Sequence, residues 1–244
     1  CGLQTIGLVN VPSSTIAREA DAVLPTRAGP EIGVASTKAF TAQLTVLLCF
    51  AVVLARAKGQ IDEARAEAIH ADIQALPGLV GKALGLFDAI RPVAHQLSQA
   101  KSALYLGRGA LYPLAMEGAL KLKELSYIHA EGFASGEMKH GPIALIEEGL
   151  PVVALLAADA VMAKASSNLR EASARGGKII LLSEARAAAE VDYASAVITV
   201  PDVDPLLAPI LLAIPAQILA YLTAVEKGTD VDQPRNLAKS VTVE

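Results

Sequence analysis

The sequence contains little of what disulfide-rich or metal-stabilised proteins depend on. Of its 244 residues only Cys1 and Cys49 are cysteines, and none is tryptophan. This excludes a disulfide framework and a cysteine-based zinc cluster. No two of the four histidines have the spacing of metal ligands on a helix, so we expect no bound metal. Cys49 lies in the apolar run Leu-Leu-Cys-Phe-Ala, which predicts a buried thiol that behaves as a small hydrophobe.

A large excess of charge of one sign is also missing. The chain carries 21 basic and 25 acidic side chains, a net charge of -4, without a long run of like charge. This balance argues against nucleic acid as a partner and against a polybasic membrane anchor. The amino terminus lacks a basic segment followed by an apolar block, so we expect a reduced, cytoplasmic setting. Neither a Walker loop nor a complete dinucleotide fingerprint occurs, and we expect no cofactor.

One segment is long and apolar enough to raise the question of a membrane span. Residues 206–225 contain no charged side chain and approach the length that crosses a bilayer. The segment also contains Pro209, Pro215 and Gln217, and Asp204 and Glu226 bound it. No second segment of this kind is evident in the sequence. We therefore expect a buried helix and no membrane partner.

Hydrophobic residues make up 53% of the chain, which excludes global disorder. Short β-rich segments alternate with helical stretches rich in alanine and leucine, and the β-rich segments are continuously apolar. Such runs are typical of parallel strands covered on both faces. The pattern predicts an α/β fold with a parallel sheet between helices. The expected strands are 5–10, 21–26, 103–106, 152–156, 178–183 and 196–201.

A weak internal repeat suggests two domains. Two strands lead into a long apolar helix that ends at Lys58, and the same order recurs before Lys227. Only the second copy has a strand, a helix and a strand ahead of it, so we expect the chain to begin inside its first α/β domain. The predicted division is 1–60 for this incomplete domain, 61–100 for a helical connector, 101–228 for a complete domain and 229–244 for a tail.

The densest polar set lies in a strongly helix-prone segment. Glu117, Lys121 and Glu124 fall within roughly 60° of one another around a helix with about 100° per residue. One interpretation is an exposed ion pair that stabilises the helix by about 0.2–0.5 kcal/mol. The other is a proton-transfer site in which a shared cleft separates the pKa values of two carboxyls. Spacing alone favours the exposed pair and leaves both open.

Three further features could carry chemistry. His140 lies between glycine and proline in a loop, where a histidine can act as an acid or base. Lys239 would be a nucleophilic amine only if the tail folds over a cleft and desolvates it. Gly107-Arg108-Gly109 follows a strand and precedes a helix, a turn that can approach anions through its backbone N–H groups. A tight strand-to-helix turn explains these glycines equally well.

Five segments carry a resemblance to a known family. Together they closely resemble the isomerase half of the glucosamine-6-phosphate synthases, over essentially the whole chain. That half consists of two sugar-isomerase (SIS) domains, each a parallel α/β sandwich. The resemblance thus implies an SIS-type fold with one incomplete and one complete SIS domain. The segments are Glu-Ile-Gly-Val-Ala-Ser-Thr-Lys-Ala-Phe (31–40), Glu-Gly-Ala-Leu-Lys-Leu-Lys-Glu (117–124), Tyr-Ile-His-Ala-Glu (127–131), Gly-Glu-Met-Lys-His-Gly-Pro (136–142) and Gly-Thr-Asp-Val-Asp-Gln-Pro-Arg-Asn-Leu-Ala-Lys-Ser-Val-Thr-Val-Glu (228–244).

The resemblance implies a role for each matching residue. Glu124 resembles the base that moves a proton between C1 and C2 of the sugar. His140 resembles the ring-opening acid–base residue, which in the family comes from the neighbouring subunit. Lys239 resembles the tail lysine that forms a Schiff base with the open-chain ketose. Glu117 and Lys121 match family positions that support the proton transfer. The family positions that line the sugar site correspond to Val34, Ser36 and Ala238.

The family converts fructose-6-phosphate and ammonia into glucosamine-6-phosphate, and its active site is shared within a homodimer. Its phosphate-binding loop and its glutaminase domain would both precede residue 1. Cys1 is interpreted as a fragment boundary and not as the glutaminase nucleophile. We therefore expect an isomerase portion that binds sugar phosphate weakly on its own. The alternatives are a non-catalytic SIS module that binds a phosphosugar and regulates a partner, and a related enzyme that deglycates amino sugars, against which the long tail argues.

Overall fold

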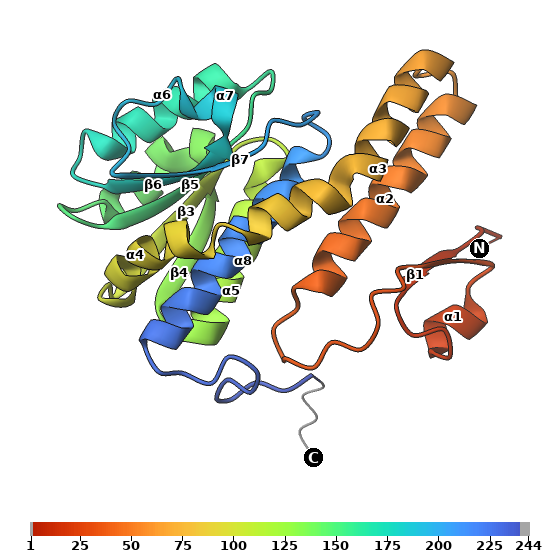
Figure 1. The fold of residues 1–244 in the computed structure, drawn as a ribbon, viewed down its shortest axis with the longest axis horizontal. Helices are drawn as coiled ribbons and strands as arrows, with labels where there is room; N and C mark the ends of the chain where they lie inside the picture. Colours follow the sequence, from red (N-terminus) through yellow and green to blue (C-terminus); the bar gives the residue numbers. More distant parts are fainter. Residues whose placement is uncertain (1, 240–244) are drawn as a thin grey trace. The chain divides into compact units, whose positions relative to one another are not determined.

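The computed structural model describes residues 2–239 (Figure 1). The chain forms two compact units, Cys1–Gln74 and Ala75–Glu244. Helix α3 (Glu63–Leu84) runs across the boundary between them. Each unit contains a sheet of parallel strands, with two strands in the first and five in the second. The predicted parallel α/β fold is therefore confirmed.

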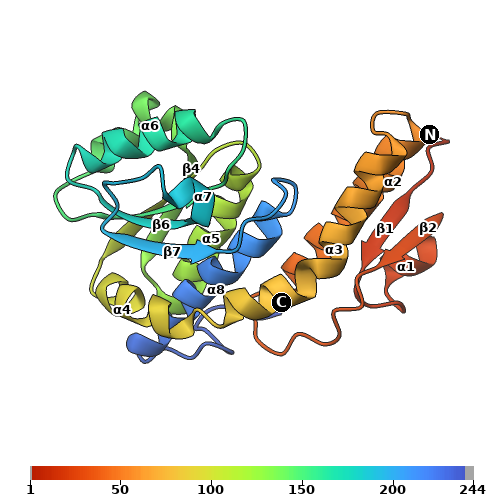
Figure 2. The ribbon, with the colours of Figure 1, turned by 45° about the horizontal axis from the view of Figure 1, so that its top comes forward.

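The first unit is a β–α–β–α segment. Strand β1 (Ile6–Val9) pairs in parallel with β2 (Ala22–Pro25), and α1 (Thr15–Glu19) connects them (Figure 2). Ser14 begins this short helix as its N-cap, because its hydroxyl accepts a hydrogen bond from the Ala17 N–H at 3.2 Å. An irregular segment then leads from β2 into the long helix α2 (Lys38–Ala57).

The second unit contains the five-stranded sheet, in the order β4-β3-β5-β6-β7. The order reverses direction at β3, because β4 lies on one side of that strand and β5 on the other. This is the arrangement of a doubly wound sheet. The central strands are buried along almost their whole length, as their unbroken apolar sequences predict. The strands are β3 (Ser102–Gly107), β4 (His129–Ala134), β5 (Pro151–Leu156), β6 (Lys178–Glu184) and β7 (Ala196–Val200).

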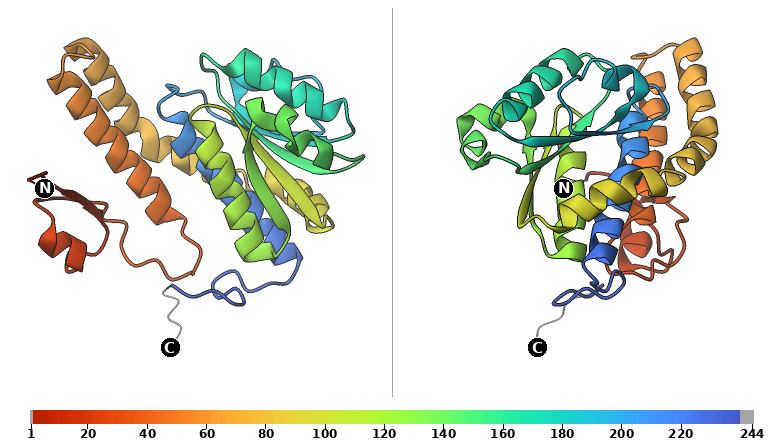
Figure 3. Two further views of the ribbon diagram at one scale, coloured as in Figure 1. Left: turned by 180° about the vertical axis from the view of Figure 1, so that it is seen from behind. Right: turned by 60° about the vertical axis from the view of Figure 1, so that its left-hand side comes forward.

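Helices cover both faces of this sheet (Figure 3). One face carries α4 (Phe87–Ser98), α5 (Leu111–Ser126) and α8 (Ala208–Glu226), and the other carries α6 (Met162–Ser173) and α7 (Ala185–Ala188). Two 3-10 helices, η1 (Ser135–His140) and η2 (Pro142–Leu145), follow β4. Helix α5 packs against α8 and against β3 and β4. Helix α5 lies very close to β3 at Gly118. A Cβ atom at this position of α5 would lie 2.7 Å from the ring of Tyr105 in β3.

Among residues 2–239, two helices are long and apolar enough to cross a membrane by length and composition, α8 and α2, and the bent pair of α3 and α4 would count as a third if it formed one span. In α8, 78% of the apolar window is buried inside the second unit, so the predicted buried helix is confirmed. The statement that no second such segment exists is wrong. Lys38 and Arg56 stand near the two ends of α2, and the polar residues between them are uncharged.

The prediction of a buried Cys49 is wrong for a related reason. Cys49 is exposed, and no other residue of α2 is buried either. The apolar sequence around Cys49 correctly indicates a helix with apolar character. It does not indicate whether another element covers the face on which the cysteine lies. Cys1 lies outside the described residues.

All six expected strands are present, with bounds that differ by at most one residue at either end. Sequence analysis missed β4, whose residues His-Ala-Glu-Gly-Phe-Ala include few with high β propensity. This strand lies at the edge of the sheet, where only one neighbour pairs with it. Residues 61–100 contain α3 and α4 and no strand. The predicted four-part division of the chain remains a prediction.

Candidate active site

Helix α5 brings together the three side chains that its spacing placed on one face. The Lys121 Nζ atom lies 2.5 Å from Glu124 Oε2 and 3.6 Å from Glu117 Oε1. The lysine is 3% exposed, and the two glutamate side chains are 16% and 20% exposed. We refer to these three residues as the α5 triad. The structure thereby rules out the interpretation as a solvent-exposed surface pair.

The burial of Lys121 gives the α5 triad its electrostatic character. Taking an ammonium group out of water costs several kcal/mol unless opposite charges and hydrogen bonds replace the water. Both carboxylates are therefore required as partners for the lysine. They also leave the triad with an excess of one negative charge, carried by side chains that still reach solvent. A carboxylate that is held in place and remains accessible is suited to proton transfer.

We predict that Lys121→Met lowers the free energy of unfolding of the second unit by about 1–3 kcal/mol, because it removes the buried cation that both carboxylates contact. Urea unfolding measures this change. Lys123→Met, an exposed lysine on the same helix, is the matched control and should change stability by less than about 0.5 kcal/mol. The triple variant with Glu117→Gln and Glu124→Gln should recover most of the loss. A triple variant as unstable as Lys121→Met alone would contradict this account of the triad.

The carboxyl-terminal tail runs against the end of α5. Tyr127 ends the helix in a left-handed conformation, with φ of 61°. Its hydroxyl accepts a hydrogen bond of 2.8 Å from the Arg235 N–H, and the Arg235 guanidinium stacks 4.1 Å from the centre of the same ring. The Thr229 hydroxyl donates to the Leu125 carbonyl at 2.6 Å. These contacts hold the tail beside Glu124.

A turn at the start of the tail adds a further constraint. The N–H groups of Gln233 and Asp232 both donate to Asp230 Oδ1 at 2.9 Å. These hydrogen bonds lower the pKa of the Asp230 carboxyl below its usual range. Their contribution is thus present above the ordinary pKa of aspartate and is lost as the pH falls through the lowered one. At neutral pH the turn directs the chain toward Pro234, which is buried.

A pocket of about 520 Å³ lies between the tail and the end of α5. Glu124 lines it from the helix, and Leu237 lines it from the tail. Ala238 and Lys239 follow directly and are exposed. Two residues span at most about 7 Å, so the backbone of Lys239 lies within that distance of Leu237. The other lining residues are Leu120, Lys123, Tyr127, Ile128, His129, Arg235 and Asn236.

The other predicted site residues lie elsewhere. His140 ends η1 and is exposed, with its Nε2 atom 4.0 Å from Glu137, and it does not line the pocket beside Glu124. Val34 and Ser36 belong to the first unit, in the segment between β2 and α2. The structure therefore brings together the α5 triad and the tail. The roles of His140, Val34 and Ser36 remain predictions.

Sequence reasoning missed the residues that hold the tail, Tyr127, Thr229 and Arg235. A tyrosine in a left-handed helix end has no reliable sequence signal, since glycine and asparagine are the usual residues there. A threonine and an arginine in a polar tail resemble solvated residues. The usable signal was that all three residues lie within the resemblance segments 127–131 and 228–244.

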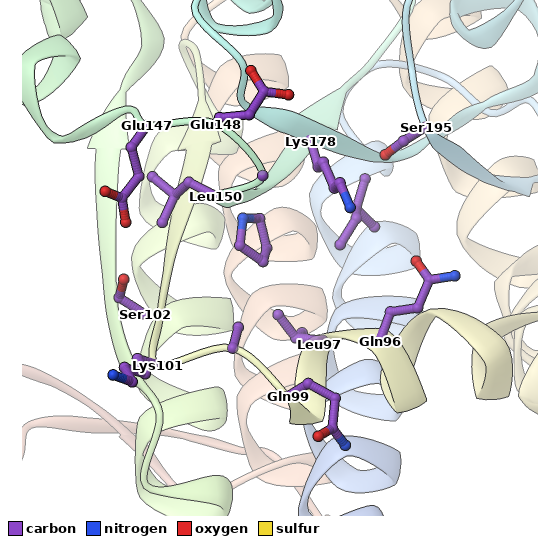
Figure 4. A pocket seen from close by; sticks show the side chains of 14 residues that line it. Gln96, Leu97, Gln99, Lys101, Ser102, Glu147, Glu148, Leu150, Lys178 and Ser195 are labelled. Atoms are coloured by element: carbon purple, nitrogen blue, oxygen red, sulfur yellow. The ribbon is translucent and has the colours of Figure 1, made fainter.

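Two other pockets differ in position from this one. The first, of about 560 Å³, lies at the amino ends of the strands of the second unit and combines Lys101 and Lys178 with Glu147 and Glu148 (Figure 4). The second, of about 570 Å³, lies in the first unit beside β1 and β2. Among residues 2–239, no three histidine, cysteine or acidic side chains are grouped as metal ligands.

Comparison with known proteins gives consistent matches. A family model described as "SIS domain" matches residues 2–53 and 96–227. A glutamine–fructose-6-phosphate aminotransferase (isomerizing) of Brucella abortus is 55% identical over an alignment of 245 positions, which covers 100% of this chain and 40% of that protein. The protein of the same name from Zymomonas mobilis is 57% identical over 97% of this chain and 39% of its own length. The chain thus spans about two fifths of the length of these curated relatives.

A solved structure agrees with these matches. It is the C-terminal domain of glucosamine-fructose-6-phosphate aminotransferase from Francisella tularensis, and it superposes with a TM-score of 0.90. The two sequences are 43% identical, and the match covers 94% of this chain and 65% of that one. A glucosamine-6-phosphate deaminase from Thermotoga maritima, 23% identical with a TM-score of 0.71, shares the fold.

Proposed function

This chain belongs to the SIS-domain family, and on that premise we propose that it is the isomerase portion of an enzyme that makes glucosamine-6-phosphate. The substrates would be fructose-6-phosphate and ammonia, which a glutaminase domain releases from glutamine in the cytoplasm. The observation that carries this proposal is the buried Lys121 between two accessible carboxylates, beside a tail segment that lines the same pocket and leads to Lys239. A module that only binds a phosphosugar has no need for this combination.

In the proposed reaction Lys239 acts as the nucleophile. Its amine condenses with the C2 carbonyl of the open-chain ketose and releases water, which leaves a protonated imine. The positive charge of that imine acidifies the C–H bond at C1. Ammonia can then displace the lysine by amine exchange, which leaves nitrogen on C2 and restores the free lysine. Ala238 would line the sugar site next to this amine, with Val34 and Ser36.

Glu124 would move the proton. Its carboxylate removes a proton from C1 and returns one to C2, which converts the ketose skeleton into an aldose. Lys121 holds Glu124 at 2.5 Å and keeps that carboxylate oriented. Glu117 balances the charge of the lysine from the opposite side, 3.6 Å away. One positioned carboxylate that reaches both carbons suffices, because C1 and C2 are neighbours on the open chain.

We assign the ring opening to His140 of a neighbouring subunit. This histidine is exposed on η1 and lies outside the Glu124 pocket, which supports a role toward another copy of the chain. The proposed assembly is a homodimer with shared active sites.

Calorimetry with fructose-6-phosphate tests the proposal. We expect weak binding by residues 1–244 alone, with a Kd on the order of 1 mM or above, because the family's phosphate-binding loop precedes these residues. A fusion protein that adds the upstream part of the Brucella abortus relative should bind at least about tenfold more tightly. The absence of binding by the fusion protein, under conditions where that relative binds, would contradict the proposal.

A further inference from the structure

A second polar cleft lies at the carboxyl edge of the sheet in the second unit. It has a volume of about 410 Å³ and is bordered by the segments that follow β3, β4 and β5. The strand order reverses at β3, between β4 and β5, and ligands of open α/β sheets bind at such switch points. The cleft is lined by Arg108, Lys139, Lys164, Ser167, Asn168 and Glu171.

Arg108 is the central cation of this cleft. Its guanidinium is half-buried and donates to Asn168 Oδ1 at 3.0 Å, and among the described residues it has no carboxylate partner. A guanidinium has five N–H donors in a planar fork, so most of them lack a protein acceptor. The side chain passes against Gly136, where a Cβ atom would lie 2.5 Å from its nitrogen. The backbone at Gly136 thus leaves room for the Arg108 side chain, which no acidic side chain of residues 2–239 neutralises.

The surroundings of Arg108 reinforce its positive charge. Lys164 is exposed on the first turn of α6 and has no hydrogen-bond or ion-pair partner in the described part of the chain. Lys139 is paired with Glu171 at 2.9 Å. Three cations against one carboxylate give the lining a net charge of +2, although the whole chain carries -4.

An unsatisfied hydroxyl lies at the same edge. Ser135 directly precedes Gly136, its side chain is 1% exposed, and its Oγ atom has no hydrogen-bond partner among the described residues. Buried polar groups of this kind are rare in native proteins and call for an explanation. The nearby Asp159 carboxylate does not line the cleft, and its Oδ1 atom accepts from the Val161 N–H at 2.9 Å.

We propose that this cleft binds a phosphate-type dianion, either free phosphate or the phosphoryl group of a sugar phosphate. Arg108 would supply a bidentate fork and Lys164 a second, mobile charge. The site is separate from the α5 triad. Helix α5 begins just after Arg108, and Glu124 lies 13 residues beyond Leu111, or roughly 20 Å along the axis. The inference does not depend on the isomerase proposal.

Titration of the ¹⁵N-labelled protein (residues 1–244) with inorganic phosphate, followed by amide NMR, tests this inference. We expect amide signals at 108–109 and 163–168 to shift with a Kd on the order of 1 mM. Lys164→Glu should weaken binding at least about tenfold, because it replaces an attraction by a repulsion. Arg108→Lys keeps the charge but loses the fork, and it should also weaken binding. Lys227→Glu, an equal charge change at the exposed lysine that follows the end of α8, is the control and should bind as the unsubstituted chain does.

Fructose-6-phosphate provides the second arm of the test. If inorganic phosphate and fructose-6-phosphate shift the signals of 108–109 and 163–168 with equal affinity, the cleft recognises the phosphoryl group alone. If fructose-6-phosphate binds more tightly, the cleft also contacts the sugar. Shifts confined to 120–128, or equal weakening by Lys164→Glu and Lys227→Glu, would overturn the inference. The first of these results would leave the isomerase proposal intact.

Discussion

Replacing Glu124 by glutamine should reduce exchange of the C1 proton of the sugar with solvent by about 10²–10⁴-fold. The amide has nearly the shape of the carboxylate but cannot accept the proton. The assay uses the fusion protein described above, fructose-6-phosphate in deuterated water, and detection of deuterium at C1 and C2. Affinity for the sugar phosphate should change little, because the substitution removes a base and not a binding group.

The matched control for this experiment is Glu190→Gln, which makes the same chemical change at an exposed glutamate of the second unit. It should exchange at the unsubstituted rate. Glu124→Gln also removes one charge partner of Lys121, so its folding is checked by urea unfolding. A folded Glu124→Gln protein that exchanges at the unsubstituted rate would remove Glu124 from the mechanism.

Replacing Lys239 by alanine should abolish trapping of a sugar adduct by borohydride. The reagent reduces an imine between the lysine amine and C2 to a stable secondary amine. Intact-protein mass spectrometry detects the added mass, and digestion locates it. The unsubstituted fusion protein should carry the adduct on the peptide that contains Lys239.

Lys123→Ala is the control for the trapping experiment. Lys123 lines the same pocket from α5, so its loss tests whether any nearby amine can form the adduct. Trapping should persist in this variant. Trapping at an undiminished level in Lys239→Ala would assign the imine to a different amine and would contradict the proposed role of the tail.

The α5 triad shows what sequence spacing can and cannot establish. Helical periodicity correctly placed Glu117, Lys121 and Glu124 on one face. It left open whether that face is exposed, and the surface ion pair was the favoured interpretation. Burial of Lys121 results from tertiary packing of α5 against α8 and two strands, which no local pattern in 117–124 encodes.

The errors in the fold have a similar origin. Strand β4 lies at the sheet edge and contains glycine and alanine in place of β-branched residues, so pairing with β3 and not intrinsic propensity makes it a strand. Cys49 was expected to be buried because its neighbours are apolar. Whether a residue of α2 is exposed depends on which other elements pack against that helix. The positions of the six predicted strands do not show which elements do so.

The tail beside Glu124 was expected from the resemblance and not from residue properties. A polar tail such as 229–239 would ordinarily be interpreted as solvated. The contacts of Tyr127 with Arg235 and of Thr229 with Leu125, together with the buried Pro234, explain how this segment stays on the helix. They hold the tail that leads to Lys239 against the end of α5. That Lys239 acts beside Glu124 is the central claim of the proposed mechanism.

Paramagnetic relaxation in solution tests that claim most directly. Cys1 and Cys49 are replaced by serine, Lys239 by cysteine, and a nitroxide label is attached to the new thiol. The account predicts strong broadening of the amide signals of 120–128, at the end of α5, and no broadening at 163–168 on α6. Unbroadened signals at 120–128 would show that the tail lies away from Glu124 and would contradict the proposed active site.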